Sequence, residues 1–107
     1  MPNPILLLST CESAEEAERI ATALVEERLA ACVNIVPGLT SVYRWHGVVE
    51  RATEQLLLMK TTEEQRAALQ QRLGELHSYE VQEILELPIT GGNQKYLTWL
   101  RAQVASV

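Results

Sequence analysis

The stretch Ala31–Lys60, with the sequence ACVNIVPGLTSVYRWHGVVERATEQLLLMK, decides the fold of this chain. It is rich in β-branched and aromatic residues, which predicts one strand over Ala31–Trp45 and a second, returning strand over Val48–Lys60. Two strands of this length extend beyond any core that a 107-residue chain can form, and an isolated ribbon is only marginally stable in water. We therefore expect another subunit to cover the outer half of the ribbon.

Five residues of the same stretch are assigned structural roles. Pro37 and Gly38 interrupt the first strand, which predicts a bulge or a bend rather than its end. His46 and Gly47 form the turn, where glycine supplies the positive φ that a tight hairpin requires. Cys32, at the start of the first strand, is interpreted as a small buried apolar residue.

The residues before the ribbon predict a strand followed by a helix. Ile5–Ser9 is a short apolar run that is typical of a buried strand. Ser13 and Glu16 form a capping-box pattern, in which each side chain hydrogen-bonds to the backbone of the other residue. Apolar residues then recur at helical spacing at Ala14, Ala17, Ile20, Ala21, Leu24, Val25 and Leu29.

The residues after the ribbon predict a helix, a strand and a last helix. Thr62 with Gln65, or Thr61 with Glu64, starts the second helix. Tyr79–Leu87 forms a fourth strand that Pro88 stops, and Asn93 caps the final helix. The whole chain, residues 1–107, is predicted to be one domain. The order of elements predicts the α+β class, as a ferredoxin-like βαββαβ sandwich with a long β-hairpin and a C-terminal helix.

Composition excludes several classes of function. The chain has 14 acidic and 9 basic residues, a net charge of −5, and no two basic residues are adjacent. Nucleic-acid binding needs clustered positive charge, so we expect no nucleic-acid partner. No apolar run approaches the ~20 residues of a membrane span, and the sequence shows no export signal. We therefore expect a cytoplasmic protein with no membrane partner.

The segment from His77 to Glu83 holds a histidine, a phenol and two carboxylates at the junction of a predicted helix and strand. One hypothesis is a metal or polar-ligand site. The alternative is that His77 closes the helix by bonding to its last carbonyls, while the carboxylates of Glu80 and Glu83 stay solvated. Glu80 and Glu83 would lie on opposite faces of a strand, which argues against an acid–base pair.

Cys11 is interpreted as the reactive or ligating thiol, because a thiolate near a helix N-terminus can have a lowered pKa, while the adjacent Glu12 works against that lowering. A set of cysteine, histidine and carboxylate side chains suits copper or zinc. No combination of nucleophile, base and oxyanion-stabilising group is present, so we expect no enzymatic activity.

Four of the five aromatic residues are Tyr43, Trp45, Tyr96 and Trp99, which we interpret first as interface or core residues and only second as a ligand pocket. Lys60 ends an apolar strand. We interpret it as an exposed strand terminus, with anion binding as the alternative.

Several segments together carry a resemblance to a known family. They are LAACVNIVPG at 29–38, TSVYRWHG at 40–47, HSYEVQEI at 77–84, Pro88-Ile89, and YLTWL at 96–100. These segments resemble the signatures of the CutA family of divalent-cation tolerance proteins, in order and with unbroken spacing over nearly the whole chain. The family usually has proline where Ser78 and Gln82 stand here.

The resemblance implies a ferredoxin-like protomer in a tight homotrimer, similar in architecture to the PII signalling proteins, and a cytoplasmic protein linked to copper and divalent-cation tolerance. It also implies clefts between subunits, lined by residues such as His77, Tyr79, Glu80, Lys60 and Trp45. The candidate metal ligands are His77, Cys11 and Glu80, with Cu(II) or another divalent cation as the ion. The candidate cleft residues are Tyr43, Trp45, Lys60, Tyr79, Glu83 and Trp99.

Two functions follow as hypotheses. The first is a trimeric, non-enzymatic protein that binds divalent cations near His77. The second is a PII-like module that binds a small ligand or a partner in clefts between subunits, without a physiological metal.

Overall fold

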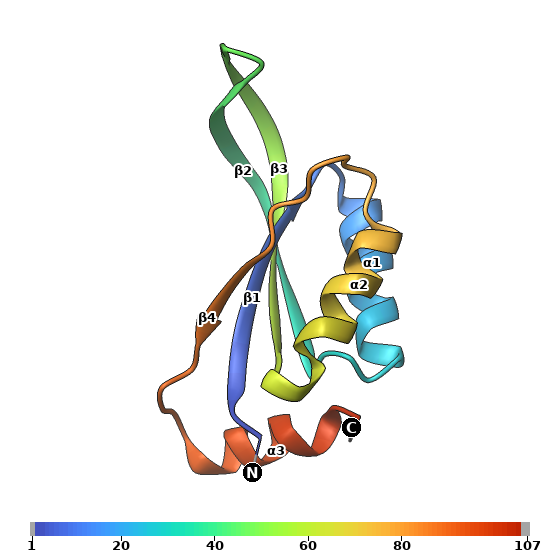
Figure 1. Ribbon diagram of the computed structural model, residues 1–107, viewed down its shortest axis with the longest axis vertical. Helices are drawn as coiled ribbons and strands as arrows, with labels where there is room; N and C mark the ends of the chain where they lie inside the picture. The colour runs from blue at the N-terminus through green and yellow to red at the C-terminus, as the bar shows by residue number, and fades with distance from the viewer. Residues whose placement is uncertain (1, 106–107) are drawn as a thin grey trace.

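The computed structural model describes residues 2–105, in which four strands and three α-helices form a mixed α+β structure (Figure 1). The order is β1 (Pro4–Cys11), α1 (Ala14–Glu26), β2 (Cys32–Trp45), β3 (Val48–Thr62), α2 (Arg66–Leu76), β4 (Leu85–Pro88) and α3 (Gln94–Gln103). A short 3-10 turn, Glu63–Gln65, precedes α2. The strands form one antiparallel sheet in the order β2-β3-β1-β4, so the predicted α+β class is confirmed. No helix within residues 2–105 is long and apolar enough to cross a membrane.

One face of the sheet packs against α1 and α2 and forms the main core. Strand pairing sets Leu7 of β1 opposite Met59 of β3, and both side chains are fully buried. Helix α1 contributes Leu24 and helix α2 contributes Leu73 to the same cluster. The helical spacing in the sequence correctly predicted that Ala17, Ile20 and Leu24 are buried, whereas Ala14 and Val25, which it placed on the same face, are exposed. The side chain of Ser13 caps α1 as predicted, because its Oγ accepts the backbone N–H of Glu16 at 3.1 Å.

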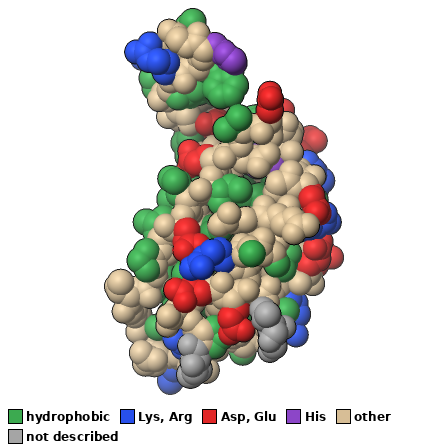
Figure 2. All heavy atoms as spheres, viewed as in Figure 1, with side chains coloured by type: hydrophobic (Ala, Val, Ile, Leu, Met, Phe, Trp, Pro, Cys, Tyr) green, Lys and Arg blue, Asp and Glu red, His purple; other side chains and the backbone are tan. Residues whose placement is uncertain are grey.

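The opposite face of the sheet, which we call the open face, is apolar along most of its length. Helix α3 covers one end of it, where the Lys60 ammonium lies 5.8 Å from the centre of the Tyr96 ring. Elsewhere Val36, Leu85 and Leu87 are 41%, 54% and 40% exposed. Figure 2 shows hydrophobic side chains gathered on the side away from α1 and α2. From the strand register, the open face carries Leu6, Leu8, Val36, Leu56, Leu58, Leu85 and Leu87.

Strands β2 and β3 form the predicted ribbon, which projects beyond the helices (Figure 1). The register shifts between Val36 and Leu39, which is the bulge predicted at Pro37-Gly38, and Gly38 has a φ of +67°. At the tip His46 and Gly47 both have positive φ, +48° and +79°, which suits a tight two-residue hairpin. The cover that we expect from a second subunit stays a prediction.

The fourth strand is shorter than predicted. Instead of Tyr79–Leu87, β4 spans only Leu85–Pro88 and pairs with Ile5–Leu8 of β1. At Thr10, which a longer β4 would reach, the backbone carbonyl accepts a hydrogen bond from the His77 ring at 2.7 Å instead of one from a strand partner. The ladder stops before this residue, and the chain from 77 to 84 follows an irregular path.

The start of α2 also differs from the prediction. Thr62 makes no capping hydrogen bond, because β3 extends through this residue and its side chain is buried. Asn93, by contrast, caps α3 as predicted, since its Oδ1 accepts the backbone N–H groups of Lys95 and Tyr96 at 2.9 and 3.2 Å.

The core predicts a large contrast between two neighbouring residues of α1. Leu24→Ala should lower the free energy of unfolding by about 2–5 kcal/mol, because it leaves a cavity among fully buried side chains. Val25→Ala is the matched control, since Val25 is 41% exposed, and should change stability by about 0.5 kcal/mol or less. Urea denaturation at a fixed protein concentration measures both. Equal effects would contradict the assigned buried face.

Candidate functional site

A pocket of about 530 Å³ lies between the ribbon and the irregular segment that follows α2. Its size falls within the range that small-molecule sites occupy. The ribbon forms one wall and residues 79–83 form the other, with Thr10 of β1 at the base of the ribbon. The lining residues are Thr10, Ser41, Val42, Tyr43, Trp45, Glu50, Glu54, Tyr79, Glu80, Val81 and Glu83.

The charge of this pocket is entirely negative among the residues that the structure describes. Glu50 and Glu54 come from β3, and Glu80 and Glu83 from the irregular segment, whereas no lysine, arginine or histidine lines the pocket. Because the segment is not a strand, Glu80 and Glu83 both reach the same pocket instead of alternating between two faces. Several carboxylates beside low-dielectric walls create a potential that attracts cations.

Glu54 is the buried member of the four carboxylates, at 6% exposed. Its Oε2 accepts a hydrogen bond of 2.7 Å from the Tyr79 hydroxyl, which joins the two walls of the pocket. Burial and the neighbouring Glu54 raise the pKa of Tyr79 well above its usual range. The phenol therefore stays protonated and acts as a hydrogen-bond donor to the carboxylate at any physiological pH.

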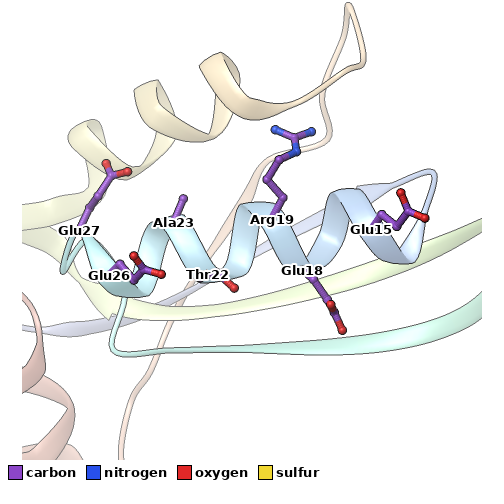
Figure 3. Close-up of a pocket in the computed structure, with 7 residues that line it drawn as sticks. All are labelled: Glu15, Glu18, Arg19, Thr22, Ala23, Glu26 and Glu27. Atoms are coloured by element: carbon purple, nitrogen blue, oxygen red, sulfur yellow. The ribbon is translucent and has the colours of Figure 1, made fainter.

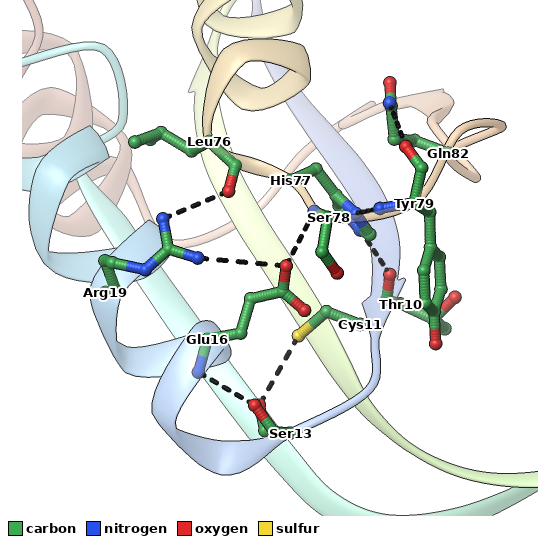
Figure 4. Close-up of polar contacts among 10 residues, drawn as sticks. All are labelled: Thr10, Cys11, Ser13, Glu16, Arg19, Leu76, His77, Ser78, Tyr79 and Gln82. Carbon is green, nitrogen blue, oxygen red and sulfur yellow. Dashed lines mark hydrogen bonds and ion pairs between the residues drawn. The ribbon is translucent and has the colours of Figure 1, made fainter.

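The segment that forms the second wall is anchored by Glu16, which lies in the first turn of α1 (Figure 4). The predicted capping box forms only in part, because the Glu16 carboxylate turns away and accepts the backbone N–H of Ser78 at 2.7 Å. Burial raises the pKa of Glu16, but the hydrogen bonds from Ser78 outweigh burial and leave the pKa below its usual value. The Arg19 guanidinium lies 3.9 Å from the same carboxylate.

His77 fixes the same wall through both nitrogens of its ring. Nε2 lies 2.7 Å from the Thr10 carbonyl oxygen, and Nδ1 accepts the backbone N–H of Tyr79 at 3.1 Å. Since Nδ1 accepts, the ring proton sits on Nε2 and is donated to Thr10. His77 is thus structural, as one of the two interpretations proposed: its backbone N–H closes α2 by donating to the Leu73 carbonyl at 2.9 Å, while its ring bonds to β1. Neither nitrogen is free to bind an ion.

Cys11 does not have the lowered pKa that the sequence predicted. The thiol is fully buried, and burial together with the negative charge of Glu16 raises its pKa to about 11. Its Sγ lies 3.8 Å from the backbone carbonyl oxygen of Ser13, as a weak donor. The prediction was wrong because it used the position near a helix N-terminus and left out burial, which disfavours the charged thiolate.

The predicted metal ligands do not form a chelating set within one chain. Within residues 2–105, no three histidine, cysteine, aspartate or glutamate side chains lie close enough to hold a metal ion. Cys11 and His77 make the hydrogen bonds described above, and Glu80 lines the pocket. The described residues therefore do not fit a preformed copper or zinc site. Completion of such a set by a second subunit stays a prediction.

The predicted cleft residues divide into two groups. Tyr43, Trp45, Tyr79 and Glu83 all line the pocket. Lys60 and Trp99 belong to the end of the open face that α3 covers. There, Lys60 donates to the Asn34 side chain at 2.6 Å, and the ring of Trp99 lies 5.5 Å from that of Tyr96. Cys32 is half-buried, with its Sγ 4.0 Å from the Lys60 ammonium, so it is not the core residue that we predicted.

Glu50 and Glu54 were not identified from the sequence. The tight turn at 46–47 contains the signal that could have found them, because it sets the register of the ribbon. That register pairs Tyr43 with Glu50 and Leu39 with Glu54. The pairing with Tyr43 brings Glu50 to the face of the ribbon that carries the candidate residues Tyr43 and Trp45.

A second hollow of about 530 Å³ follows the outer surface of α1 (Figure 3). Its residues all come from this helix and from Glu27, which follows it. Their side chains diverge, with Glu18 on one side of the helix and Arg19 and Glu27 on the other. A surface of one helix without a facing wall is a solvated charged face, and we assign it no ligand.

Comparisons with known proteins show which family has this fold. The family model described as CutA1 divalent ion tolerance protein matches residues 5–103. The divalent-cation tolerance protein CutA of Thermus thermophilus is 58% identical over 96 residues, which cover 90% of this chain and 93% of that protein. Human protein CutA is 44% identical over 98 residues. These cover 92% of this chain and 55% of the human protein, so the chain spans about half of that longer relative.

Solved structures agree with the sequence matches. The crystal structure of CutA1 from Oryza sativa is 42% identical, with a TM-score of 0.96, and the match covers 99% of this chain and 97% of that one. A structure described as the periplasmic divalent cation tolerance protein CutA from Archaeoglobus fulgidus is 39% identical. Its TM-score is 0.92, and the match covers 95% of this chain and 99% of that one.

The hydrogen bond from Ser78 to Glu16 predicts a pH-dependent contribution to stability. Glu16→Gln should lower the free energy of unfolding by about 1–3 kcal/mol at neutral pH, because it removes a charged acceptor from a buried site. The carboxyl has a pKa of 4.5 when unfolded and a lower one when folded. Its contribution is therefore fully present above pH 4.5 and is lost as the pH falls through the folded value.

Denaturation curves from neutral to acidic pH test this, with Glu15→Gln as the control. Glu15 lies next to Glu16 but is exposed, so its loss should have little effect at any pH. A difference between native protein and Glu16→Gln that does not shrink with acid would contradict the assigned role.

Proposed function

Because the chain belongs to the CutA1 divalent ion tolerance protein family, we propose that it is a cytoplasmic, non-enzymatic homotrimer that responds to divalent cations. In this proposal the protomer is ferredoxin-like, and the subunits meet through their sheets. The observation that carries the cation response is the pocket, where four carboxylates and no basic side chain of the described residues come together.

The open face supports the homotrimer. A sheet with one face packed and the other apolar and exposed is not a stable end state in water, because large exposed apolar patches mark interaction surfaces. Val36, Leu85 and Leu87 are at least 40% exposed in the single chain, and burying them between copies would stabilise all three subunits. Contact with a neighbour would also cover the exposed edge of the ribbon.

The proposed response to cations keeps only Glu80 from the ligand set predicted from the sequence. His77 is fully hydrogen-bonded and the Cys11 thiol has a raised pKa, so neither side chain is available as it stands. We propose instead that the negative charge of Glu50, Glu80 and Glu83, which are exposed at the pocket but form no chelating set within one chain, attracts divalent cations. Oxygen ligands of this kind favour hard divalent cations over copper.

A second candidate function is a PII-like module that binds a small molecule, without a physiological metal. The observation that favours it is the composition of the pocket walls. Tyr43, Trp45 and Tyr79 line a volume of about 530 Å³, which is far more than a single ion needs.

The homotrimer predicts different results for two valines of equal exposure. The native protein should sediment at three times the chain mass of 12.0 kDa. Val36 on the open face and Val25 on α1 are both 41% exposed in the single chain. Val36→Asp should dissociate the assembly, because it places a charge in the interface, whereas Val25→Asp should not. A folded monomer of the native chain, or the reverse pattern in the variants, would contradict the proposal.

The proposed cation ligands predict a second contrast. Equilibrium dialysis of the reduced protein against Zn(II) should give weaker binding for Glu50→Gln with Glu80→Gln and Glu83→Gln, because three negative charges are lost from the pocket. Cys11→Ala should bind as the native protein does, since this buried thiol does not meet the ion. Loss of binding in Cys11→Ala alone would show that the thiol is a ligand and would contradict the proposal.

A further inference from the structure

We infer that the core holds a binding site for ordered water beside Cys11, on the side of the sheet that packs against α1 and α2. Three buried side-chain atoms there have no hydrogen-bond partner among residues 2–105, namely Ser9 Oγ, Glu16 Oε1 and Gln55 Oε1. The site therefore lies on the other side of the sheet from the open face.

Cys11 is the common neighbour of the three side chains. Gln55 is its partner on β3, and Ser9 precedes it by two residues on β1, so the three side chains point to the same face. That face is the packed one, because Leu57, the partner of Ser9, belongs to the main core. Glu16 approaches from α1, since its charge helps to raise the pKa of Cys11, and Figure 4 shows its second carboxylate oxygen on the side of the thiol.

The missing partners of these atoms must lie inside the fold. Ser9, Glu16 and Gln55 are 0%, 5% and 9% exposed, and the three atoms themselves are fully enclosed by the chain. A second subunit that docked on the surface would not touch them, in whatever way copies of the chain assemble. The unpaired atoms are therefore a property of the core and not of a surface that a neighbour could cover.

Water fits the chemistry of this group of atoms. Burying a polar atom without a partner is costly, and most of all for a charged oxygen such as that of Glu16. The carboxylate can only accept hydrogen bonds, whereas the side chains of Ser9 and Gln55 can donate and accept. Water also donates and accepts, and a buried water typically makes about three hydrogen bonds to groups that are otherwise unpaired.

Other classes of ligand fit less well. Residues 2–105 contain no group of three histidine, cysteine, aspartate or glutamate side chains that could hold a metal ion. An anion would meet the carboxylate of Glu16, and an apolar molecule would leave the three atoms without partners. A larger polar molecule could not enter, because the three atoms are enclosed.

The bound water makes Ser9 and Gln55 positioning residues for Glu16. One oxygen of the carboxylate, Oε2, already accepts the backbone N–H of Ser78 at 2.7 Å. Water at Oε1 fixes the other oxygen, so the carboxylate is held at both ends. The buried cluster thus supports the segment after α2, to which Ser78 belongs, from inside the core.

A high-resolution crystal structure of the native protein tests the site directly. We expect ordered water within about 2.7–3.2 Å of Glu16 Oε1 and of at least one of Ser9 Oγ and the Gln55 side chain. A dry site would overturn the inference. In a dry site the three atoms would pair with one another or with the Cys11 thiol, for example through a Gln55 amide that donates directly to Glu16.

The stability of Ser9→Ala gives an independent test in solution, by urea denaturation at a fixed protein concentration. An unpaired Oγ would destabilise the core, so its removal would raise the denaturation midpoint. Because we place water on Oγ, we expect a lower midpoint and a folding equilibrium constant reduced about fivefold, as the loss of one net hydrogen bond gives.

Ser78→Ala is the matched control for Ser9→Ala. Ser78 is exposed and keeps its backbone N–H in the variant, so its midpoint should equal that of the native protein. A midpoint of Ser9→Ala that equals or exceeds the native value would overturn the inference.

Discussion

The ring of His77 sets the geometry on which the rest of the site depends. Its Nε2 proton satisfies the Thr10 carbonyl, and its Nδ1 accepts the backbone N–H of Tyr79. The first bond stands where the ladder between β1 and β4 would continue. The chain joins the sheet only at residue 85, and before that it passes beside the ribbon. That path brings Tyr79, Glu80 and Glu83 opposite β3, where Tyr79 meets Glu54.

This arrangement gathers several acidic side chains around one pocket. Four of the chain's 14 acidic residues line this pocket, so the modest net charge of −5 understates the local field. The pocket also borders the open face, because the ribbon that forms its first wall continues into the sheet. In the proposed homotrimer, association through the open face would hold the ribbon in position and so stabilise the pocket. Assembly and ligand binding would then be coupled, although no residue of the pocket takes part in the main core.

Most of the fold could be predicted because its signals are local. The turn at His46-Gly47, the bulge at Pro37-Gly38 and the Ser13 cap each depend on residues within a few positions of one another. The site could not be predicted in the same way. His77 and Thr10 are 67 positions apart, and Glu16 and Ser78 are 62 apart. Cys11 shows the same limit, since the burial that raises its pKa is a property of the folded core and not of its neighbours in sequence.

The central claim is that His77 is a fixed structural residue and not a metal ligand. A long-range ¹H–¹⁵N NMR spectrum of the imidazole groups tests it most directly, recorded on the native protein near neutral pH before and after Zn(II) is added. The account predicts that His77 is neutral with its proton on Nε2, and that its signals do not move when Zn(II) is present. A proton on Nδ1, or a shift of the His77 nitrogens on addition of Zn(II), would contradict it.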